Sequence, residues 1–584
     1  MFDEEEKLIE DSSERDDGSE YEISESDISS IGDVNEEISD DDLDAGNQSD
    51  TEELLNFTDC FTDNEISDSL MVSPSGFRWS TNPRIQTKTR VHNIVDTSAS
   101  LSVNEFNFET ISEAFELFIS SNILSEIIEC TNKYCKEYKG IDDNKLTMEE
   151  LKAFIGILIA SGRTNGRYLA LRNVWDTCPL FKQYYFSSAM SRDRFIHIYQ
   201  TLRFDDKSTR CNRFRDSQDK FGAIRKVFHE FNNNCLHSFT PGPHITLDER
   251  LVRFRGRCPF RVFMRNKPGR YGIKLWVAAD AETSYVLNIQ PYVGKTNGVR
   301  EISQGGRVVK DLITPFYGTG RGVTVDNFFT SVPLAKELLA NKITLTGTIR
   351  ANKREIPSEF LKSPEREVFS SIFGFNGDLT LVSYVPKKNY SVNLLSTEHH
   401  DISIENEARK RPTIIAHYNK TKGGVDNADK MTLSYSCSRP TRRWPLKIFM
   451  DMLDIAALNA YILWKNKYPK WKKNCRSTRQ QFLRQLSVEL AKPNVLDRQI
   501  VSNRYSRSIK YGFSLFDENN DVNCTNDLSM RETTISTIRS RNRCHYCPRN
   551  MDKKTHITCF GCNKFLCAKH RYQKILTYCP DCNQ

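Results

Sequence analysis

Four aspartates stand at positions where a charged side chain is either costly or useful. Asp248 lies within an apolar stretch that is expected to form a strand, and Asp326 directly follows another such stretch. A carboxylate there is unfavourable unless it is paired or bound to a cation. Asp426 follows a glycine pair and is expected to begin a helix, which places Asp429 one turn later on the same face.

Carboxylates that converge can hold the metal ions of a phosphoryl-transfer site. Mg²⁺ takes hard oxygen ligands, and two such ions roughly 3.5 to 4 Å apart can activate an attacking oxygen and stabilise a leaving one. Taken singly, Asp248 and Asp326 are more often strand-end caps or ion-pair partners, and Asp426 is more often an N-terminal helix cap. Spacing along the chain alone does not single them out.

Basic residues gather beside Asp248. Nine basic residues and no acidic one lie between positions 250 and 274, and Arg253, Arg255 and Arg257 share one face if the strand is regular. A second stretch, residues 465–484, has eight basic residues and no acidic one. A basic stripe beside metal-binding carboxylates suits a phosphodiester substrate, whereas the alternative is a solvated strand face.

Trp444 is a candidate for stacking on an unpaired nucleic-acid base. It lies beside Arg442 and Arg443, and base–aromatic stacking contributes about 1 to 3 kcal/mol per base in single-strand binders. A tryptophan in this setting is more often part of the core. Both readings stay open from the sequence.

The C-terminal segment carries eight closely spaced soft or borderline metal ligands. They form four pairs: Cys544 and Cys547, Cys559 and Cys562, Cys567 and His570, and Cys579 and Cys582. Zinc takes four such ligands, so the eight predict two structural Zn²⁺ ions rather than redox or unpaired cysteines. In a cross-brace order the first and third pairs share one ion, and the second and fourth share the other; sequential pairing remains open. A module this small should need metal to fold.

These residues must be positioned by several kinds of element. Helical periodicity, with a capping box formed by Thr147 and Glu150, gives way near position 244 to strands that alternate with helices, which predicts a mixed α/β core. Trp444-Pro445 should begin a long helix that ends before Pro469. The expected units are an acidic disordered arm (1–75), a helical domain (100–243 and 437–502), an α/β domain (244–353 and 413–436) interrupted by an all-β unit (354–412), a linker (503–540) and a zinc domain (541–584).

Charge is divided unevenly along the 584 residues. Residues 1–70 hold 27 Asp or Glu against Lys7 and Arg15, which leaves 80 basic and 49 acidic residues in the rest of the chain. Such a basic body suits a polyanionic partner, and the acidic arm either solvates the chain or competes for its DNA-binding surface. The start of the chain lacks the pattern of a secretory signal, and the apolar stretch 448–464 contains Asp451 and Asp454. We therefore expect no export and no membrane span.

Three segments resemble the piggyBac family of DDE transposases, and the resemblance extends over roughly residues 100–584. The segments are 247–274, 325–331 with 347–357, and 418–426 with 443–445. The resemblance implies an RNase H-like catalytic domain with a β insertion, flanked by a helical dimerisation and DNA-binding domain. It assigns Asp248, Asp326 and Asp426 to the Mg²⁺-binding catalytic triad and matches Asp429 to a fourth carboxylate of less defined role.

The same resemblance implies partners and a reaction. It places DNA contacts at Arg350 and Lys353, and it implies that the zinc domain binds the transposon's terminal repeats. It further implies a nuclear homodimer that cuts and pastes double-stranded DNA at TTAA sites through hairpin intermediates. Two alternatives remain from the sequence: a domesticated DNA-binding protein with a silent catalytic core, and a RING-like ubiquitin ligase.

Overall fold

The computed structural model describes the chain in segments, and it divides into two compact units, Met1–Asn519 and Asn520–Gln584. The described residues are 70–83, 108–141, 144–164, 166–178, 180, 182–210, 219–265, 267, 269–294, 301–406, 408–500, 505–517, 542–551, 553–555, 557 and 564–570. Each unit is considered separately below.

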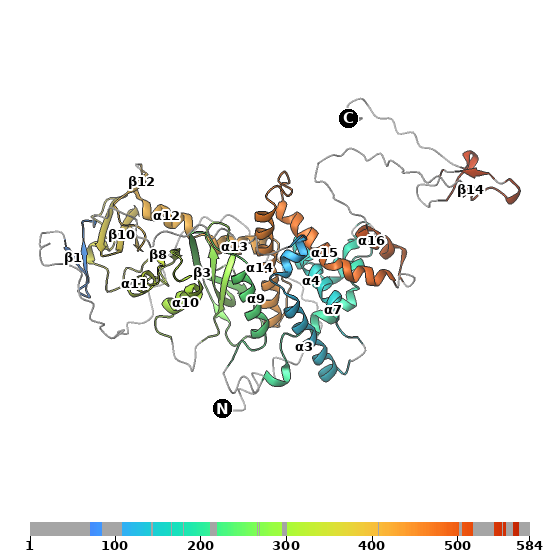
Figure 1. The fold of residues 1–584 in the computed structure, drawn as a ribbon, viewed down its shortest axis with the longest axis horizontal. Helices are drawn as coiled ribbons and strands as arrows, with labels where there is room; N and C mark the ends of the chain where they lie inside the picture. The colour runs from blue at the N-terminus through green and yellow to red at the C-terminus, as the bar shows by residue number, and fades with distance from the viewer. Residues whose placement is uncertain are drawn as a thin grey trace, which may run out of the picture. The chain divides into compact units, whose positions relative to one another are not determined.

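A mixed sheet is the centre of the larger unit (Figure 1). One part of it contains β3 (His244–Arg253), β5 (Tyr271–Asp280), β7 (Gly322–Val325) and β8 (Thr344–Thr348), with β4 (Val262–Phe263) and β6 (Val286–Pro291) both paired to β5 at the edge. β5 is antiparallel to β3 and β6, whereas β7 is parallel to β3 and β8 is parallel to β7. These strands and the helices between them form a mixed α/β fold, as the alternating pattern predicts.

The β-rich segment expected at 354–412 continues this sheet instead of forming a separate one. β9 (Ser371–Asn376), β10 (Leu379–Lys387) and β11 (Tyr390–Ser396) form a meander, and β11 pairs with the inner strand β8. Two short strands, β12 (Ile404–Asn406) and β13 (Arg411–Pro412), pair only with each other in the described part of the chain.

Residues 70–75 were expected to belong to the disordered acidic arm, but in the structure they form a strand and a turn. They form β1 (Leu70–Val72) and the turn into β2 (Arg78–Ser80), and β2 pairs with β9 through Ser80 and Phe375. Trp79 explains this placement, because its side chain is fully buried and its Nε1 donates to the Glu355 carbonyl at 2.8 Å. The rest of the expected arm, residues 1–69, lies outside the described residues.

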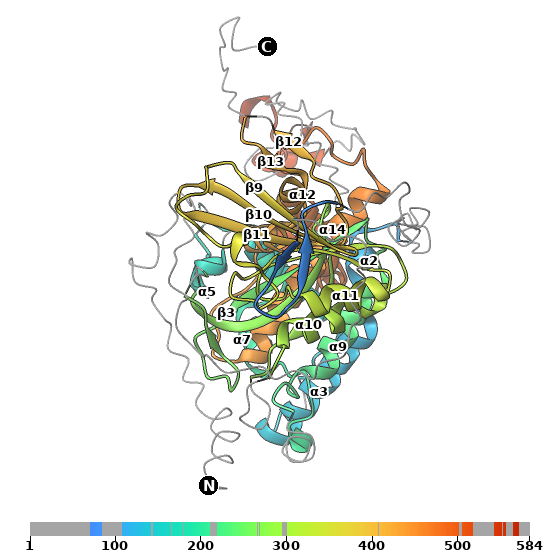
Figure 2. The same cartoon turned by 90° about the vertical axis from the view of Figure 1, so that its left-hand side faces the viewer.

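Helices cover the sheet from both sides. α10 (Gln304–Ile313) connects β6 to β7, and α11 (Val332–Ala340) connects β7 to β8. α12 (Thr413–Thr421) lies across the sheet from them (Figure 2), as does α13 (Gly424–Ser434), which follows it (Figure 1). α13 is the helix that was expected to begin at Asp426, and α12 precedes it as an additional element.

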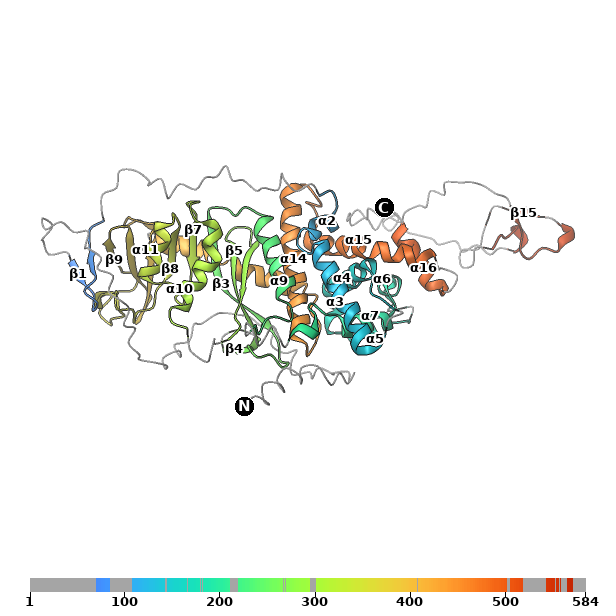
Figure 3. The ribbon, with the colours of Figure 1, turned by 60° about the horizontal axis from the view of Figure 1, so that its bottom comes forward.

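The remaining helices pack together beside the sheet. They are α2 (Ile111–Glu116), α3 (Ser121–Lys139), α4 (Met148–Arg163), α5 (Leu171–Val174), α6 (Tyr184–Ala189), α7 (Arg192–Thr201), α9 (Arg225–His237), α14 (Trp444–Lys467), α15 (Thr478–Ile500) and α16 (Arg507–Asp517). α14 runs between the sheet and most of these helices (Figure 3). It begins at Trp444 with Pro445 in its first turn, as predicted, and α4 begins with the predicted capping box. No helix in the described segments has the length and apolar character needed to cross a membrane.

α16 lies within the stretch that was expected to be a linker, residues 503–540. Phe513 and Phe516 are one turn apart on this helix and both are buried. The helix packs on α6, where Gly512 lies against the Ser188 side chain. Phe513 and Phe516, with the partly buried Ile509, give this helix an apolar face that packs against its neighbours.

Candidate metal-binding active site

Parallel pairing of β3 with β7 places Asp248 beside Asp326. The register pairs Thr246 with Thr324, so the same pairing carried two residues further sets the two aspartates opposite each other. Neighbouring strands lie roughly 4.8 Å apart. Side chains two residues apart on a strand point to the same side, so the aspartates share the face that carries the two threonines.

The junction between α12 and α13 brings Asp426 to this face. Thr246 Oγ1 donates to the Thr421 carbonyl at 2.5 Å, and Thr324 Oγ1 bonds Thr421 Oγ1 at 2.7 Å. Thr421 ends α12, and α13 begins at Gly424. A Cβ on Gly424 would lie only 2.7 Å from Thr246 Oγ1, so glycine permits α13 to start this close to the strand. Asp426 lies in the first turn of that helix.

The negative charges of Asp326 and Asp426 are close enough to Asp248 to affect its ionisation. Burial, with smaller contributions from these two charges, raises the pKa of Asp248 to about 7 despite the opposing effects of Lys267 and of a hydrogen bond from the Glu249 amide. Burial also raises the pKa of Asp326. Among the described residues, these three do not form a group whose ligand atoms all lie within 4.8 Å of one another.

This donor set fits a hard divalent cation. Three carboxylates provide the oxygen ligands that Mg²⁺ prefers, and a cation would relieve both their mutual repulsion and the cost of burying Asp248 in its charged form. The structure thus brings together the three aspartates that the sequence singled out.

Lys267 and Arg350 place positive charge at the edge of the site. Burial lowers the pKa of Lys267, but the carboxylates of Asp248 and Glu249 outweigh burial and keep that pKa above its usual value. Lys267 Nζ also donates to the Glu249 carbonyl at 3.1 Å. Arg350 partly opposes the rise that burial causes in the pKa of Asp326, and its Nε donates to Asn327 Oδ1 at 3.3 Å. Both cations could therefore meet a phosphate that approaches the aspartates.

Asp429 is held by a buried arginine. Arg250 on β3 is 5% exposed and forms an ion pair with Asp429. It also pairs with Asp451 of α14 at 2.6 Å and donates to Thr432 Oγ1 at 3.0 Å. The Arg250 guanidinium thus links β3, α13 and α14, and the Asp429 carboxylate is already engaged in an ion pair with it.

Tyr418 and Lys267 are site residues that the sequence reasoning missed. Burial raises the pKa of Tyr418 to about 12, and the charges of Asp326, Asp248 and Asp426 contribute, so its hydroxyl stays protonated. Their positions in the sequence could have indicated both residues. Tyr418 begins the segment 418–426 that contains Asp426, and Lys267 lies in the basic stretch that follows Asp248.

The expected arginine stripe is exposed but does not lie on one regular strand. β3 ends at Arg253, which pairs with Gly272 at the start of β5, and the chain then bends at Gly256. Arg255 and Arg257 therefore lie after the end of the strand. They do not share a strand face with Arg253, which was expected only if the strand continued regularly through them. All three side chains are exposed, as is that of Lys353.

Arg443 and Trp444 make contacts within the protein. Arg443 donates to the carbonyls of Tyr199 and Gln200 at the end of α7, at 3.2 and 2.9 Å, and also to that of Leu202. Trp444 is partly buried, with its ring centroid 5.6 Å from that of Phe221 and 5.0 Å from that of Phe260. These contacts favour a packing role for both residues.

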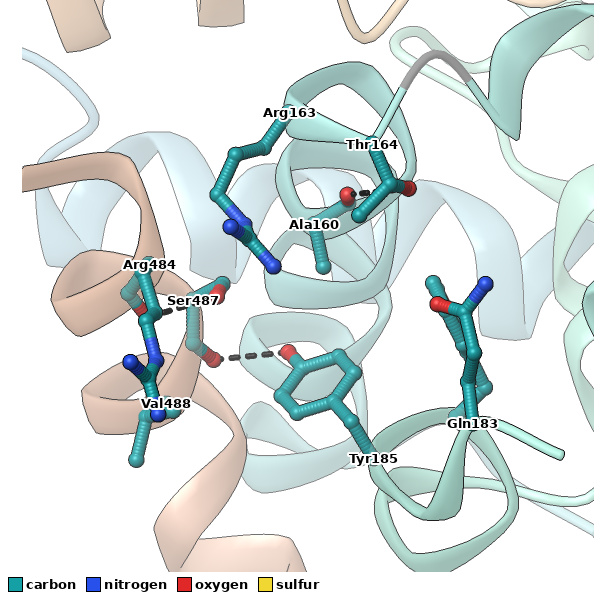
Figure 4. Close-up of a pocket in the computed structure, with 9 residues that line it drawn as sticks. Ala160, Arg163, Thr164, Gln183, Tyr185, Arg484, Ser487 and Val488 are labelled. Carbon is teal, nitrogen blue, oxygen red and sulfur yellow. Dashed lines mark hydrogen bonds between the residues drawn. The ribbon is translucent and has the colours of Figure 1, made fainter. Parts of the chain in front are cut away.

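A pocket of about 300 Å³ lies among the helices, away from the aspartates (Figure 4). Arg163 reaches from α4 toward α15, and Tyr185 donates to the Ser487 carbonyl at 2.7 Å. Among the described residues that line it, Arg163 and Arg484 are basic and none is acidic. An anion could bind here, but no carboxylate of the candidate active site contributes to it.

The smaller unit brings four of the eight predicted zinc ligands together. Cys544, Cys547, Cys567 and His570 each provide a ligand atom within 4.8 Å of the others. This is the grouping of first and third pairs that the cross-brace order predicts, and three thiols with one imidazole are compatible with zinc. The other set, Cys559, Cys562, Cys579 and Cys582, lies outside the described residues.

Comparison with known proteins gives matches over most of the larger unit. A family model described as Transposase IS4 matches residues 110–461. The chain is 27% identical over 376 residues to human PiggyBac transposable element-derived protein 3, covering 61% of each chain, and 26% identical over 369 residues to human PiggyBac transposable element-derived protein 2, covering 60% of each. The match thus spans less than two thirds of these relatives.

A solved structure matches more of the chain. It is the cryo-EM structure of a piggyBac transposase synaptic complex with hairpin DNA, and its sequence is 35% identical. The TM-score is 0.66, and the match covers 82% of this chain and 98% of that chain.

Proposed function

From the premise that this chain belongs to the piggyBac-type transposases of the Transposase IS4 family, we propose that it cuts and rejoins DNA by metal-dependent phosphoryl transfer. The observation that carries the proposal is the convergence of Asp248, Asp326 and Asp426 from β3, the end of β7 and the start of α13. Exposed basic side chains follow the first of these strands. Carboxylates for cations and arginines for phosphates are the two requirements of such a reaction.

We infer that the catalytic core is RNase H-like. Its support is the strand order β6-β5-β3-β7-β8, in which only β5 runs against the others. The proposed β insertion is the segment between β8 and α12, which adds β9 to β11 to the edge of the same sheet. The helices on either side of this core in the sequence form the proposed dimerisation and DNA-binding domain.

Each site residue has a proposed role. Asp248, Asp326 and Asp426 would hold two Mg²⁺ ions, which when bound supply the Lewis acidity for phosphodiester cleavage. Tyr418 keeps its proton and would donate it in a hydrogen bond to a phosphate oxygen. Lys267 would neutralise a neighbouring phosphate.

Asp429 is proposed to act through Arg250 rather than on DNA. Its carboxylate pairs with a guanidinium that also binds Asp451, so it is already engaged within the protein. A residue in that place fixes α13 against β3 and α14, and thereby fixes Asp426. We therefore assign Asp429 a positioning role.

The proposed reaction has a hydrolytic step and a transfer step. Water attacks a phosphodiester next to the element end, the bond to the 3′ oxygen breaks, and a 3′-hydroxyl and a 5′-phosphate remain. The 3′-hydroxyl then attacks a phosphodiester of the opposite strand or of target DNA and displaces another 3′-hydroxyl. Hairpin intermediates, TTAA target sites, a homodimer and nuclear action are proposed from family membership, and the similar solved structure contains hairpin DNA in a synaptic complex.

In vitro cleavage of DNA with candidate element ends, with and without Mg²⁺, tests this function. Asp326→Ala should abolish cleavage and leave binding to the ends largely intact, because one cation ligand is removed from a site rimmed by unchanged basic residues. Asp193→Ala is the matched control, since that side chain is 87% exposed on α7. Cleavage by the Asp326→Ala protein at the wild-type rate would overturn the proposal.

A DNA-binding protein without catalysis is the second candidate. The similar human proteins carry names that describe them as transposable element-derived. An excision assay in cells separates the two, because a protein that only binds leaves the donor DNA intact.

The zinc-binding tail is proposed to recognise the element's terminal repeats. Deleting residues 540–584 should weaken binding to the ends, and unchanged binding would count against that role. The RING-like ubiquitin ligase alternative predicts ubiquitin chain formation with a conjugating enzyme by the full chain.

A further inference from the structure

A second group of potential metal ligands lies at the opposite end of the parallel strands from the aspartates. His244 opens β3, Glu398 follows β11, and His417 lies on α12. One ligand atom of each lies within 4.8 Å of the others. Glu398 Oε1 is 4.0 Å from His244 Nε2, and Glu398 Oε2 is 3.6 Å from His417 Nε2. His244 precedes Asp248 by four residues on an extended strand, which corresponds to about 13 Å.

Gly322 allows β7 to approach these side chains closely. It is the first residue of β7 and pairs with His244. A Cβ on Gly322 would lie 2.7 Å from His244 Nδ1, 3.0 Å from Glu398 Oε2 and 3.1 Å from Thr344 Oγ1. A nitrogen, a carboxylate oxygen and a hydroxyl therefore converge beside the Gly322 backbone, and a larger residue there would push them apart.

The polar atoms around this point are poorly satisfied by the protein alone. His244 Nδ1 is buried without a hydrogen-bond partner among the described residues. Glu398 Oε2 accepts a hydrogen bond from Thr344 Oγ1 at 3.5 Å, a long distance for a partly buried carboxylate. Buried polar groups without partners are costly unless something binds them.

We propose that His244, Glu398 and His417 bind a Zn²⁺ ion that is separate from the cations at the aspartates. Two imidazoles and one carboxylate suit zinc, whereas Mg²⁺ and Ca²⁺ favour oxygen ligands throughout. His399 lies beside the set, with its ring centroid 4.7 Å from that of His417 and its Nδ1 3.1 Å from Ser396 Oγ. A fourth ligand would be His399 or water.

The ion would tie α12 to the start of β3. Thr421 lies one turn after His417 on α12, its Oγ1 donates to the His417 carbonyl at 3.0 Å, and it receives the hydrogen bonds from Thr246 and Thr324. Zinc at the middle of α12 and the threonine hydrogen bonds at its last residue would together set where α13 begins.

Metal content of the full chain, measured by inductively coupled plasma mass spectrometry after purification without chelators, tests the site. Glu398→Gln keeps the side-chain volume but removes the charge, and His417→Gln removes an imidazole. Each variant should hold one zinc ion per chain fewer than the wild type, because the cysteine ligands of the tail are untouched. His229→Gln, at an exposed histidine of α9, is the control and should retain the full zinc content.

Equal zinc content in wild type and both variants would overturn the proposal, and a loss of iron instead of zinc would overturn the choice of metal. If the variants do not fold, cobalt replacement in the wild-type chain decides the matter. Co²⁺ at His244, Glu398 and His417 should be four-coordinate, with intense visible d–d bands and no thiolate charge-transfer absorption, whereas Co²⁺ at the oxygen ligands of the aspartates should be octahedral and absorb weakly. Absence of the four-coordinate species without thiolate would refute the site.

Discussion

Replacing Asp248 by asparagine is expected to stabilise the protein in buffer without added divalent cations. Burial, with help from the charges of Asp326 and Asp426, raises the pKa of Asp248 from 3.8 to about 7. A shift of roughly three pKa units corresponds to about 4 kcal/mol, at about 1.36 kcal/mol per unit. Asparagine keeps an oxygen that can accept the hydrogen bond from the Glu249 amide. The variant should therefore gain up to about 4 kcal/mol at pH 8.

The sign of the pH dependence follows from which state binds the proton. Between about pH 4 and pH 7 the folded protein holds a proton on Asp248 that the unfolded chain has released, so wild-type stability falls as the pH rises through this window. The advantage of Asp248→Asn should thus be near zero at pH 4, grow by about 1.4 kcal/mol per pH unit, and level off above pH 7. Adding Mg²⁺ should reduce the difference, because an ion that binds only the folded wild type stabilises it.

Urea unfolding of the full chain at pH 4.5, 6 and 8, followed by tryptophan fluorescence, measures this difference. Trp276 pairs with Glu249 in the sheet and reports on the region next to Asp248. Asp193→Asn is the control, since an exposed carboxylate should give no comparable trend. An advantage that is the same at all three pH values, or that Mg²⁺ does not reduce, would refute the account of Asp248 as a buried, repelled cation ligand.

Three further outcomes follow from the packing and the ligands. Gly424→Ala should weaken Mg²⁺ binding, measured by calorimetry, because the new Cβ would lie 2.7 Å from Thr246 Oγ1 and push α13 away; unchanged affinity would contradict the close approach. Arg250→Met should lower the free energy of unfolding by about 3 to 5 kcal/mol at pH 8, since Asp429 and Asp451 lose their buried partner. A loss below about 1 kcal/mol would show that water replaces the guanidinium. Cys567→Ser should release one zinc ion from the tail, and an unchanged zinc count would exclude that ligand set.

Local sequence signals predicted several elements because their causes are local. Pro445 fits the first turn of α14, and the apolar run before Asp326 gave the bounds of β7. The capping box of α4 depends on residues three apart. By contrast, residues 70–75 were expected in the acidic arm, but β1 pairs with β2, and β2 pairs in turn with β9, about 300 positions later. Propensity over a short window carries no information about such a partner.

The sequence determined the identities of the candidate ligands, since the segments around Asp248, Asp326 and Asp426 carry the family resemblance. Only the tertiary structure decided how they meet: the parallel register of β3 and β7 sets two of them side by side, and the closeness that Gly424 allows brings the third. It also gave Trp444 partners in the protein. Strand register and helix packing depend on contacts between segments that are distant in the sequence. The sequence therefore identifies the candidate ligands, but their geometry is set only when the chain is packed.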